Sequence, residues 1–108
     1  MNGAERIARE RQRQIDVEGW GAAHDARGTP GDLNMAAVCY VIQAGSSDEV
    51  RDALRHVKPS YWPWAFAWWK PGGDNSNASR IRELEKAGAL LAAEIDRLLA
   101  LDKPENIA

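Results

Sequence analysis

Residues 78–101 read ASRIRELEKAGALLAAEIDRLLAL. Their apolar positions alternate at spacings of three and four over nearly three heptads, and these positions are Ile81, Leu84, Gly88, Leu91, Ile95 and Leu98. This period predicts one long helix with an apolar seam, which ends before Lys103-Pro104. The seam fits either an internal face of a helical bundle or a subunit interface. Gly88 and Ala92 form a notch of small residues on this helix, where another helix can approach closely.

Three shorter helices are predicted before the long one. Residues 4–18 are rich in Glu, Arg and Gln and stop at Gly19. Residues 32–44 are apolar on nearly every side, which predicts a buried central helix, and residues 46–57 start with a capping box of Ser46 and Glu49. Asn77 is predicted to cap the long helix. We therefore expect a single all-α domain over residues 1–108, a small bundle of about four helices with a Trp-rich loop before the long C-terminal helix.

Composition and charge exclude several classes of function. A formal net charge of -2 and a pI near 5.6 argue against general binding of duplex nucleic acid, which needs a basic face. The single cysteine, Cys39, lies in an apolar run and is expected to be a buried, inert thiol. The start of the chain has no apolar signal region, and no stretch approaches the ~20 apolar residues of a membrane span. We expect a soluble, cytoplasmic protein without a membrane partner.

Four of the five tryptophans fall in residues 61–71, which read YWPWAFAWWKP. Large rings on a loop bounded by prolines either fill a small core or form the wall of a pocket for a flat ligand. Because two helices already supply an aliphatic core, we expect a division of roles. Trp62 and Trp68 are predicted to pack onto the core. Trp64 and Trp69, beside Lys70, are predicted to line a ligand site.

Polar residues of the first third are the second group of candidates. Arg11 shares a helical face with Ile7 and Ile15, so the first helix is either a solvated surface helix or a seam in which Arg11 and Gln14 turn inward toward an anion. His24 and Asp25 suggest half of a metal or acid–base site, or a pair that orders the loop and hydrogen-bonds a ligand. The second reading is favoured because no further metal ligands are evident. The predicted ligand-binding residues are Arg11, Arg13, Gln14, Trp20, His24, Asp25, Trp64, Trp69 and Lys70.

The sequence contains no recognisable catalytic motif, and it assigns no catalytic residue, metal or cofactor. An all-helical nucleotide pyrophosphohydrolase, which holds magnesium with carboxylates from neighbouring helices, is the enzyme alternative. Glu83, Glu94 and Asp96 have helical spacing for that role, but such a site needs a denser set of carboxylates. Binding without catalysis is therefore the favoured interpretation.

Several motifs taken together resemble a family of small uncharacterised proteins encoded by phages and prophages. The motifs are 10–14 (ERQRQ), 18–20 (EGW), 24–25 (HD), 31–33 (GDL), 62–64 (WPW), 68–71 (WWKP) and 86–90 (KAGAL). The resemblance spans most of the chain. Ala26 and Ala65 depart from it, since the family tends to carry acidic residues at both positions, and this weakens any metal-site hypothesis. Residues 5–40 are also distantly similar to the ryanodine-receptor repeat domain, whose bacterial and phage forms are associated with nucleotide-like ligands.

These resemblances imply a phage protein that acts in the cytoplasm of the infected host cell. Some small phage proteins are oligomeric sponges that sequester nucleotide immune signals such as cyclic dinucleotides or ADP-ribose derivatives. We expect this chain to be such an anti-defence protein, a homo-oligomer that binds a nucleotide-like small molecule. Tryptophan would stack on the base, Arg and Lys would contact phosphate, and His24 and Asp25 would read ribose or base edges. The remaining alternative is a phage factor that docks onto a host protein through its tryptophans or its long helix.

Overall fold

The computed structural model describes residues 1–19 and 30–102. These residues form four α-helices and one 3-10 turn, and they contain no β-strand. The elements are α1 (Gly3–Glu18), α3 (Asp32–Gly45), α4 (Asp48–Arg55), η1 (Phe66–Trp68) and α5 (Asn77–Leu101). The predicted all-α fold with a long C-terminal helix is confirmed.

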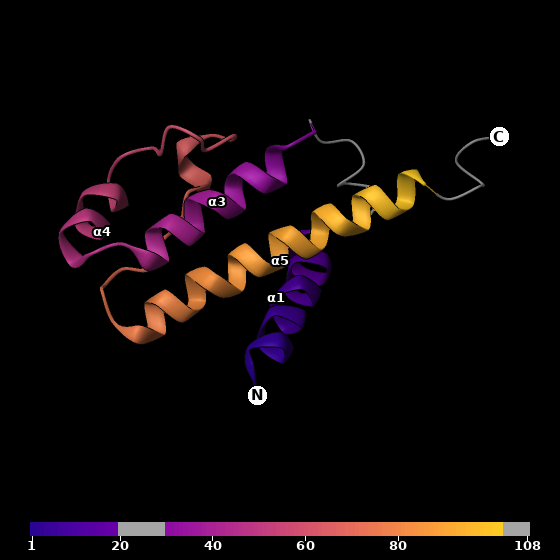
Figure 1. Ribbon diagram of the computed structural model, residues 1–108, viewed down its shortest axis with the longest axis horizontal. Coiled ribbons are helices and arrows are strands. Elements are labelled where there is room, and N and C mark those ends of the chain that lie inside the picture. The colour runs from indigo at the N-terminus through magenta and orange to yellow at the C-terminus, as the bar shows by residue number, and fades with distance from the viewer. Residues whose placement is uncertain (20–29, 103–108) are drawn as a thin grey trace.

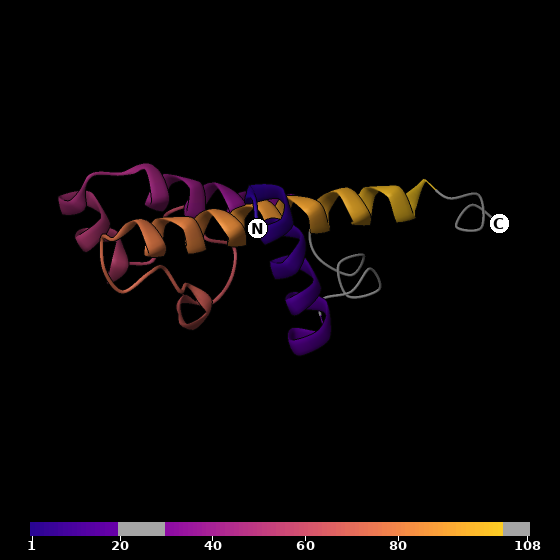
Figure 2. The same cartoon turned by 90° about the horizontal axis from the view of Figure 1, so that it is seen from below.

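The long helix α5 is the axis of the molecule (Figure 1). The helix α3 runs antiparallel to its first half, because Arg80 donates to the carbonyl of Ala44 at 2.7 Å while Lys86 lies over the ring of Tyr40. The helix α1 crosses α5 at a steep angle (Figure 1). Seen from below, α1 begins beside α5 at the level of the layer formed by α3 and α5, and then descends to the side of that layer on which η1 lies (Figure 2). No described element covers the opposite side of that layer.

Local caps set the ends of the helices. The helix α1 begins with a capping box between Asn2 and Glu5 and ends at Gly19, whose φ of 71° is in the left-handed region that glycine tolerates. The predicted caps of the two later helices were wrong by one residue. The cap of α4 is Ser47, because the hydroxyl of Ser46 instead donates to the carbonyl of Ile42. The cap of α5 is Ser76.

Small side chains dominate the contact between α3 and α5. The contact contains Ala36 and Ala37 of α3 and Ala87 of α5, each at most 2% exposed. Because these side chains are short, the two helices can approach closely. The tryptophan loop fills the space beside these alanines. Its Trp62 and Trp69 are about as buried as Tyr40 of α3. The core is therefore built from alanines and aromatic rings, whereas the sequence suggested a mainly aliphatic core.

A buried ion pair fastens the segment after the tryptophans to the helices. Arg51 of α4 is fully buried and pairs with Glu83 of α5, Nη2 to Oε2 at 3.0 Å. Its remaining donors reach the carbonyls of Gln43 and Asp74 and the side chain of Asn75. Because all of these acceptors are paired with one guanidinium, α3, α4, α5 and the 72–75 segment are held in one arrangement.

The notch predicted at Gly88 is where α1 meets α5. The side chain of Ile7 lies so close that a Cβ placed on Gly88 would be 2.6 Å from its Cδ1. The rest of the predicted seam is not internal to the described chain, because its large side chains remain about half exposed. Among the described residues, no helix is both long enough and apolar enough to cross a membrane.

Candidate functional site

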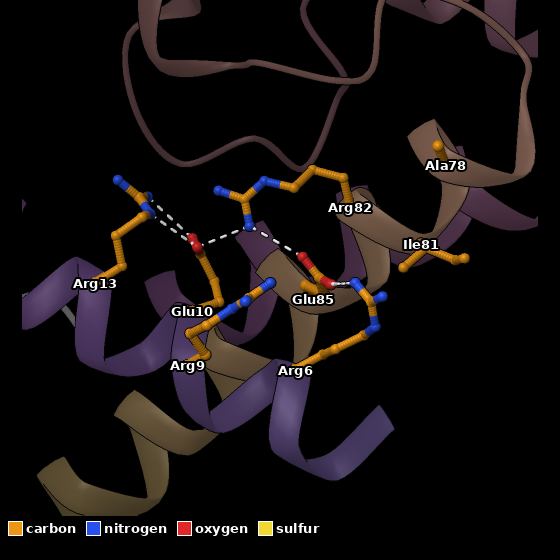
Figure 3. A pocket seen from close by; sticks show the side chains of 8 residues that line it. All are labelled: Arg6, Arg9, Glu10, Arg13, Ala78, Ile81, Arg82 and Glu85. Carbon is orange, nitrogen blue, oxygen red and sulfur yellow. Dashed lines mark hydrogen bonds and ion pairs between the residues drawn. The ribbon is translucent and has the colours of Figure 1, made fainter. Parts of the chain in front are cut away.

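A cleft of about 630 Å³ separates α1 from the first half of α5 (Figure 3). Its lining, called the arginine cleft below, consists of Arg6, Arg9, Glu10, Arg13, Ala78, Ile81, Arg82 and Glu85. The α1 residues lie at spacings of three and four and so share one helical face. Four arginines against two glutamates leave the lining with an excess of two positive charges. This local charge contrasts with the net charge of -2 of the whole chain.

The two glutamates order three of the arginines. Glu10 accepts hydrogen bonds from Arg13 at 2.8 and 2.9 Å and from Arg82 at 2.7 Å. Glu85 accepts from Arg6 and from Arg82, each at 3.2 Å. Arg82 therefore bridges the two carboxylates and connects α5 to α1. Burial opposes ionisation of Glu10, but the hydrogen bonds and charges of Arg13 and Arg82 outweigh it and lower the pKa of this carboxyl to about 2.

The guanidinium groups keep unused donors toward the cleft. A guanidinium has five N–H groups, and Arg6 uses one of them while Arg82 uses only its Nη1. Arg9 makes no hydrogen bond or ion pair with any described residue, and its side chain extends into the space between Glu10 and Glu85 (Figure 3). An anion in this space would meet donors from both helices, since carboxylate and phosphate oxygens suit the planar guanidinium fork.

The predicted residues of α1 are brought to different places. Arg13 lines the arginine cleft. Gln14 is buried and donates to Glu10 at 3.2 Å, while its carbonyl oxygen has no hydrogen-bond partner among the described residues. Arg11 turns inward, as one of the two interpretations predicted, but it pairs with Asp96 of α5 at 3.1 Å. The anion that Arg11 contacts is thus a carboxylate of the protein itself.

The predicted roles of two tryptophans are reversed. Trp69 is only 5% exposed, donates its indole N–H to the carbonyl of Leu54 at 3.0 Å and packs against Tyr40, so it belongs to the core. Trp68, which was expected in the core, is 58% exposed. The η1 turn explains the reversal, because adjacent residues of a tight turn point in different directions.

The other rings follow the prediction more closely. Trp62 is buried, as expected, and donates to the carbonyl of Ala65. Trp64 is partly buried and packs edge-on against Trp62 with ring centroids 5.4 Å apart. Lys70 is exposed, with its ammonium 5.7 Å from the ring of Trp68. Trp20, His24 and Asp25 lie outside the described residues.

Lys86 of α5 contacts the tryptophan loop. Its ammonium donates to the carbonyl of Lys70 at 2.9 Å and lies 5.5 Å from the ring of Tyr40. Burial lowers the pKa of Lys86, and the charge of Arg82 lowers it further. Burial also raises the pKa of Tyr40 to about 12. Lys86 and Tyr40, whose hydroxyl accepts from the Lys70 N–H at 3.2 Å, thus hold the end of the tryptophan loop against α5 and α3.

The carboxylates considered for a hydrolase are engaged by arginines. Glu83 pairs with Arg51, Glu94 pairs with Arg97, and Asp96 pairs with Arg11. In residues 1–19 and 30–102, no group of three or more His, Cys, Asp or Glu side chains is placed to hold a metal ion. Burial raises the pKa of the Cys39 thiol, as expected for an unreactive cysteine.

Sequence reasoning missed five charged residues of the cleft. They are Arg6, Arg9, Glu10, Arg82 and Glu85. A signal was present, because Arg6, Arg9 and Arg13 recur at positions i, i+3 and i+7. Helical periodicity shows that these side chains share a face, but it does not show which other helix that face meets.

Compared with known protein families, with curated proteins and with solved structures, the chain matches none.

Proposed function

We propose that this protein binds a phosphate-bearing, nucleotide-like small molecule in the arginine cleft and holds it without converting it. The observation that carries the proposal is Arg9, a guanidinium without a partner among the described residues, in a cleft lined by three further arginines. The volume of about 630 Å³ lies within the range of ordinary small-molecule sites. Arg6 and Arg82 would add donors from opposite walls.

The base would be held by an aromatic ring of the tryptophan loop. Of the tryptophans predicted for this role, Trp64 keeps some accessible surface and Trp69 keeps almost none. Stacking on one ring contributes about 1–3 kcal/mol per base. The described lining consists of Arg, Glu, Ala and Ile, and its carboxylates are held by arginines, which supports retention of a ligand over a chemical reaction.

In this proposal the protein is the anti-defence sponge that its phage-like motifs imply. It would act as a homo-oligomer in the cytoplasm of the infected cell and sequester a cyclic dinucleotide or an ADP-ribose derivative. An arginine-rich site suits such ligands, because each carries at least two phosphate charges or a pyrophosphate.

The test is isothermal titration of the purified protein with cyclic dinucleotides, ADP-ribose derivatives and inorganic pyrophosphate, followed by chromatography of the recovered ligand. We expect saturable binding and unchanged ligand. Arg9→Ala should weaken binding about 10- to 100-fold, the effect of one charge-assisted hydrogen bond. Lys58→Ala, a matched loss of an exposed positive charge away from the cleft, should leave affinity unchanged.

Three results would count against the proposal. The cleft is not the site if Arg9→Ala and Lys58→Ala bind alike. Sequestration is wrong if new products appear in the recovered solution, which would favour the hydrolase alternative. If no member of the panel binds and no small molecule is retained after expression in infected cells, the nucleotide proposal fails.

One observation favours a second candidate, docking onto a host protein. Tyr61, Phe66 and Trp68 are exposed on the loop, and aromatic residues are common anchors of protein interfaces. This candidate predicts that Trp68→Ala abolishes association with a stoichiometric host protein while Arg9→Ala does not. The opposite pattern, with Arg9 essential for the anti-defence effect, would leave the cleft as the functional site.

A further inference from the structure

The predicted seam of α5 forms an exposed apolar stripe. Leu84, Leu91, Ile95 and Leu98 are 48%, 45%, 57% and 48% exposed. At 100° per residue, Leu84, Leu91 and Ile95 lie about 140–180° around α5 from Lys86, whose ammonium faces the tryptophan side. The stripe therefore points away from the tryptophan loop, and α1 borders it at Gly88, where Ile7 packs against α5. It contains no charged residue.

Two valines of α3 extend the stripe. Val41 lies about 160° around α3 from Cys39, which packs in the tryptophan cluster, and Val38 lies one turn before Val41. Both valines are exposed, at 47% and 39%. Since α3 and α5 are packed side by side, these residues and the four of α5 form one patch, called the seam patch below.

The seam patch is comparable in area to the largest apolar patch of a typical monomer. Its six side chains expose roughly 500 Å², which is within the range of the largest apolar patch on a typical monomer, and such patches are often functional. Two such patches face to face would bury about 1,000 Å² from these side chains alone, near the lower limit for a specific protein interface. The flanking residues would add to that area.

We propose that the seam patch binds a second copy of this chain, with the two α5 helices antiparallel about a two-fold axis perpendicular to them. Among the described helices, only α5 repeats large apolar residues at heptad spacing, so the surface that matches its stripe is the same stripe on another copy. Because the stripe is uncharged, self-pairing brings no like charges together. The antiparallel orientation also opposes the two helix dipoles.

The symmetry sets a register that can be tested. In an antiparallel seam, positions of one heptad type face positions of the other, so Leu84 of each copy faces Ile95 of the second copy. Leu84 is then separated from its own symmetry mate by about 16 Å along the helix axis, too far for a disulfide. Of the residues that line the arginine cleft, only Ile81 belongs to this heptad series.

The register is tested by oxidative cross-linking in a Cys39→Ala background, which removes the native thiol. The double variant Leu84→Cys/Ile95→Cys should give covalent dimers, and either single variant should give few. Equal yields from the single and double variants would overturn the antiparallel register, as would the absence of cross-linked dimer at concentrations where the protein is dimeric.

Sedimentation equilibrium of the full chain tests the interface itself. The unmodified protein should be a dimer, and Leu91→Glu should weaken association at least 100-fold. The control Val50→Glu alters an apolar side chain of similar exposure on α4, outside the seam patch, and it should leave the dimer intact. A monomeric unmodified protein, or equal effects of Leu91→Glu and Val50→Glu, would overturn the inference.

This inference specifies the homo-oligomer of the proposed function, and the two can fail separately. Titration of the Leu91→Glu variant with the ligand panel distinguishes them. If the monomeric Leu91→Glu variant binds a ligand, the only idea contradicted is that ligand binding depends on assembly. If the unmodified protein is a dimer but binds no ligand, only the sequestering function is contradicted.

Discussion

Replacing Gly88 by alanine is expected to destabilise the protein, although alanine favours helices. In the middle of a helix, alanine is more favourable than glycine by about 1 kcal/mol. At Gly88, however, the new Cβ would lie 2.6, 2.7 and 3.0 Å from Cδ1, Cγ1 and Cγ2 of Ile7. Carbon atoms pack at about 3.5–4.0 Å, so Ile7 must retreat by about 1 Å.

Ile7 cannot retreat by rotating its side chain alone. A β-branched side chain in a helix has one strongly preferred rotamer, so α1 itself must shift on α5. Overpacking of this kind costs about 1–3 kcal/mol, which exceeds the gain in helix propensity. We expect a net loss of about 1 kcal/mol and a melting temperature lower by about 4–8 °C.

The double variant separates the two contributions. In an Ile7→Ala background the clash is absent, and Gly88→Ala should raise the free energy of unfolding by up to about 1 kcal/mol. Urea denaturation of the four proteins, followed by tryptophan fluorescence and circular dichroism, gives the coupling energy, which we expect to be about 2 kcal/mol. If Gly88→Ala stabilises both backgrounds equally, the close contact between α1 and α5 at Gly88 is refuted.

Three further predictions concern other parts of the fold. Glu83→Gln should lower the free energy of unfolding by about 3–5 kcal/mol, measured by urea denaturation, because it leaves the buried guanidinium of Arg51 without its counter-charge. Because the pKa of Glu10 is lowered from 4.5 to about 2, its ionised carboxylate should contribute at most about 3 kcal/mol to the free energy of unfolding. This contribution is complete above pH 4.5 and is lost as the pH falls toward 2. Glu10→Gln should remove that part of the acid dependence in thermal melts. Trp69→Ala should lower the free energy of unfolding by about 3–5 kcal/mol because Trp69 is buried, whereas Trp68→Ala, at an exposed ring, should lower it by less than about 0.5 kcal/mol. Melting temperatures of the two variants measure this contrast, and equal losses would contradict it.

The arginine cleft could not be predicted from the sequence. The spacing of Arg6, Arg9 and Arg13 places them on one face of α1, and this is a property of any helix. Whether the face meets solvent or another helix depends on the crossing of α1 over α5, which is set by Ile7 at Gly88 and by Arg82 between two glutamates. The contacts of Ile7 with Gly88 and of Arg82 with Glu10 join residues more than about 70 positions apart in the chain. No local pattern contains that information.

The tryptophan loop shows a second limit. A helix or a strand repeats its side-chain directions, so burial can be read from the period of the sequence. The η1 turn has no such period, and Trp68 and Trp69 therefore differ in burial for reasons that neighbouring residues do not display. The hydrogen bond from Trp69 to Leu54 and its packing on Tyr40 decide which ring enters the core.

By itself, the sequence determined the elements of this protein. The four helices begin and end within about two residues of the predicted positions, because caps, glycines and prolines act on the backbone within a single turn. The heptad period of α5 and the notch at Gly88 could also be predicted from the sequence, since both are local patterns. Tertiary structure alone decided which faces meet: it buried Trp69, paired Arg11 with Asp96, gathered four arginines into a cleft and left the seam of α5 exposed. The reason is physical, because packing between helices depends on contacts between residues far apart in the chain, whereas helix formation depends mainly on neighbours.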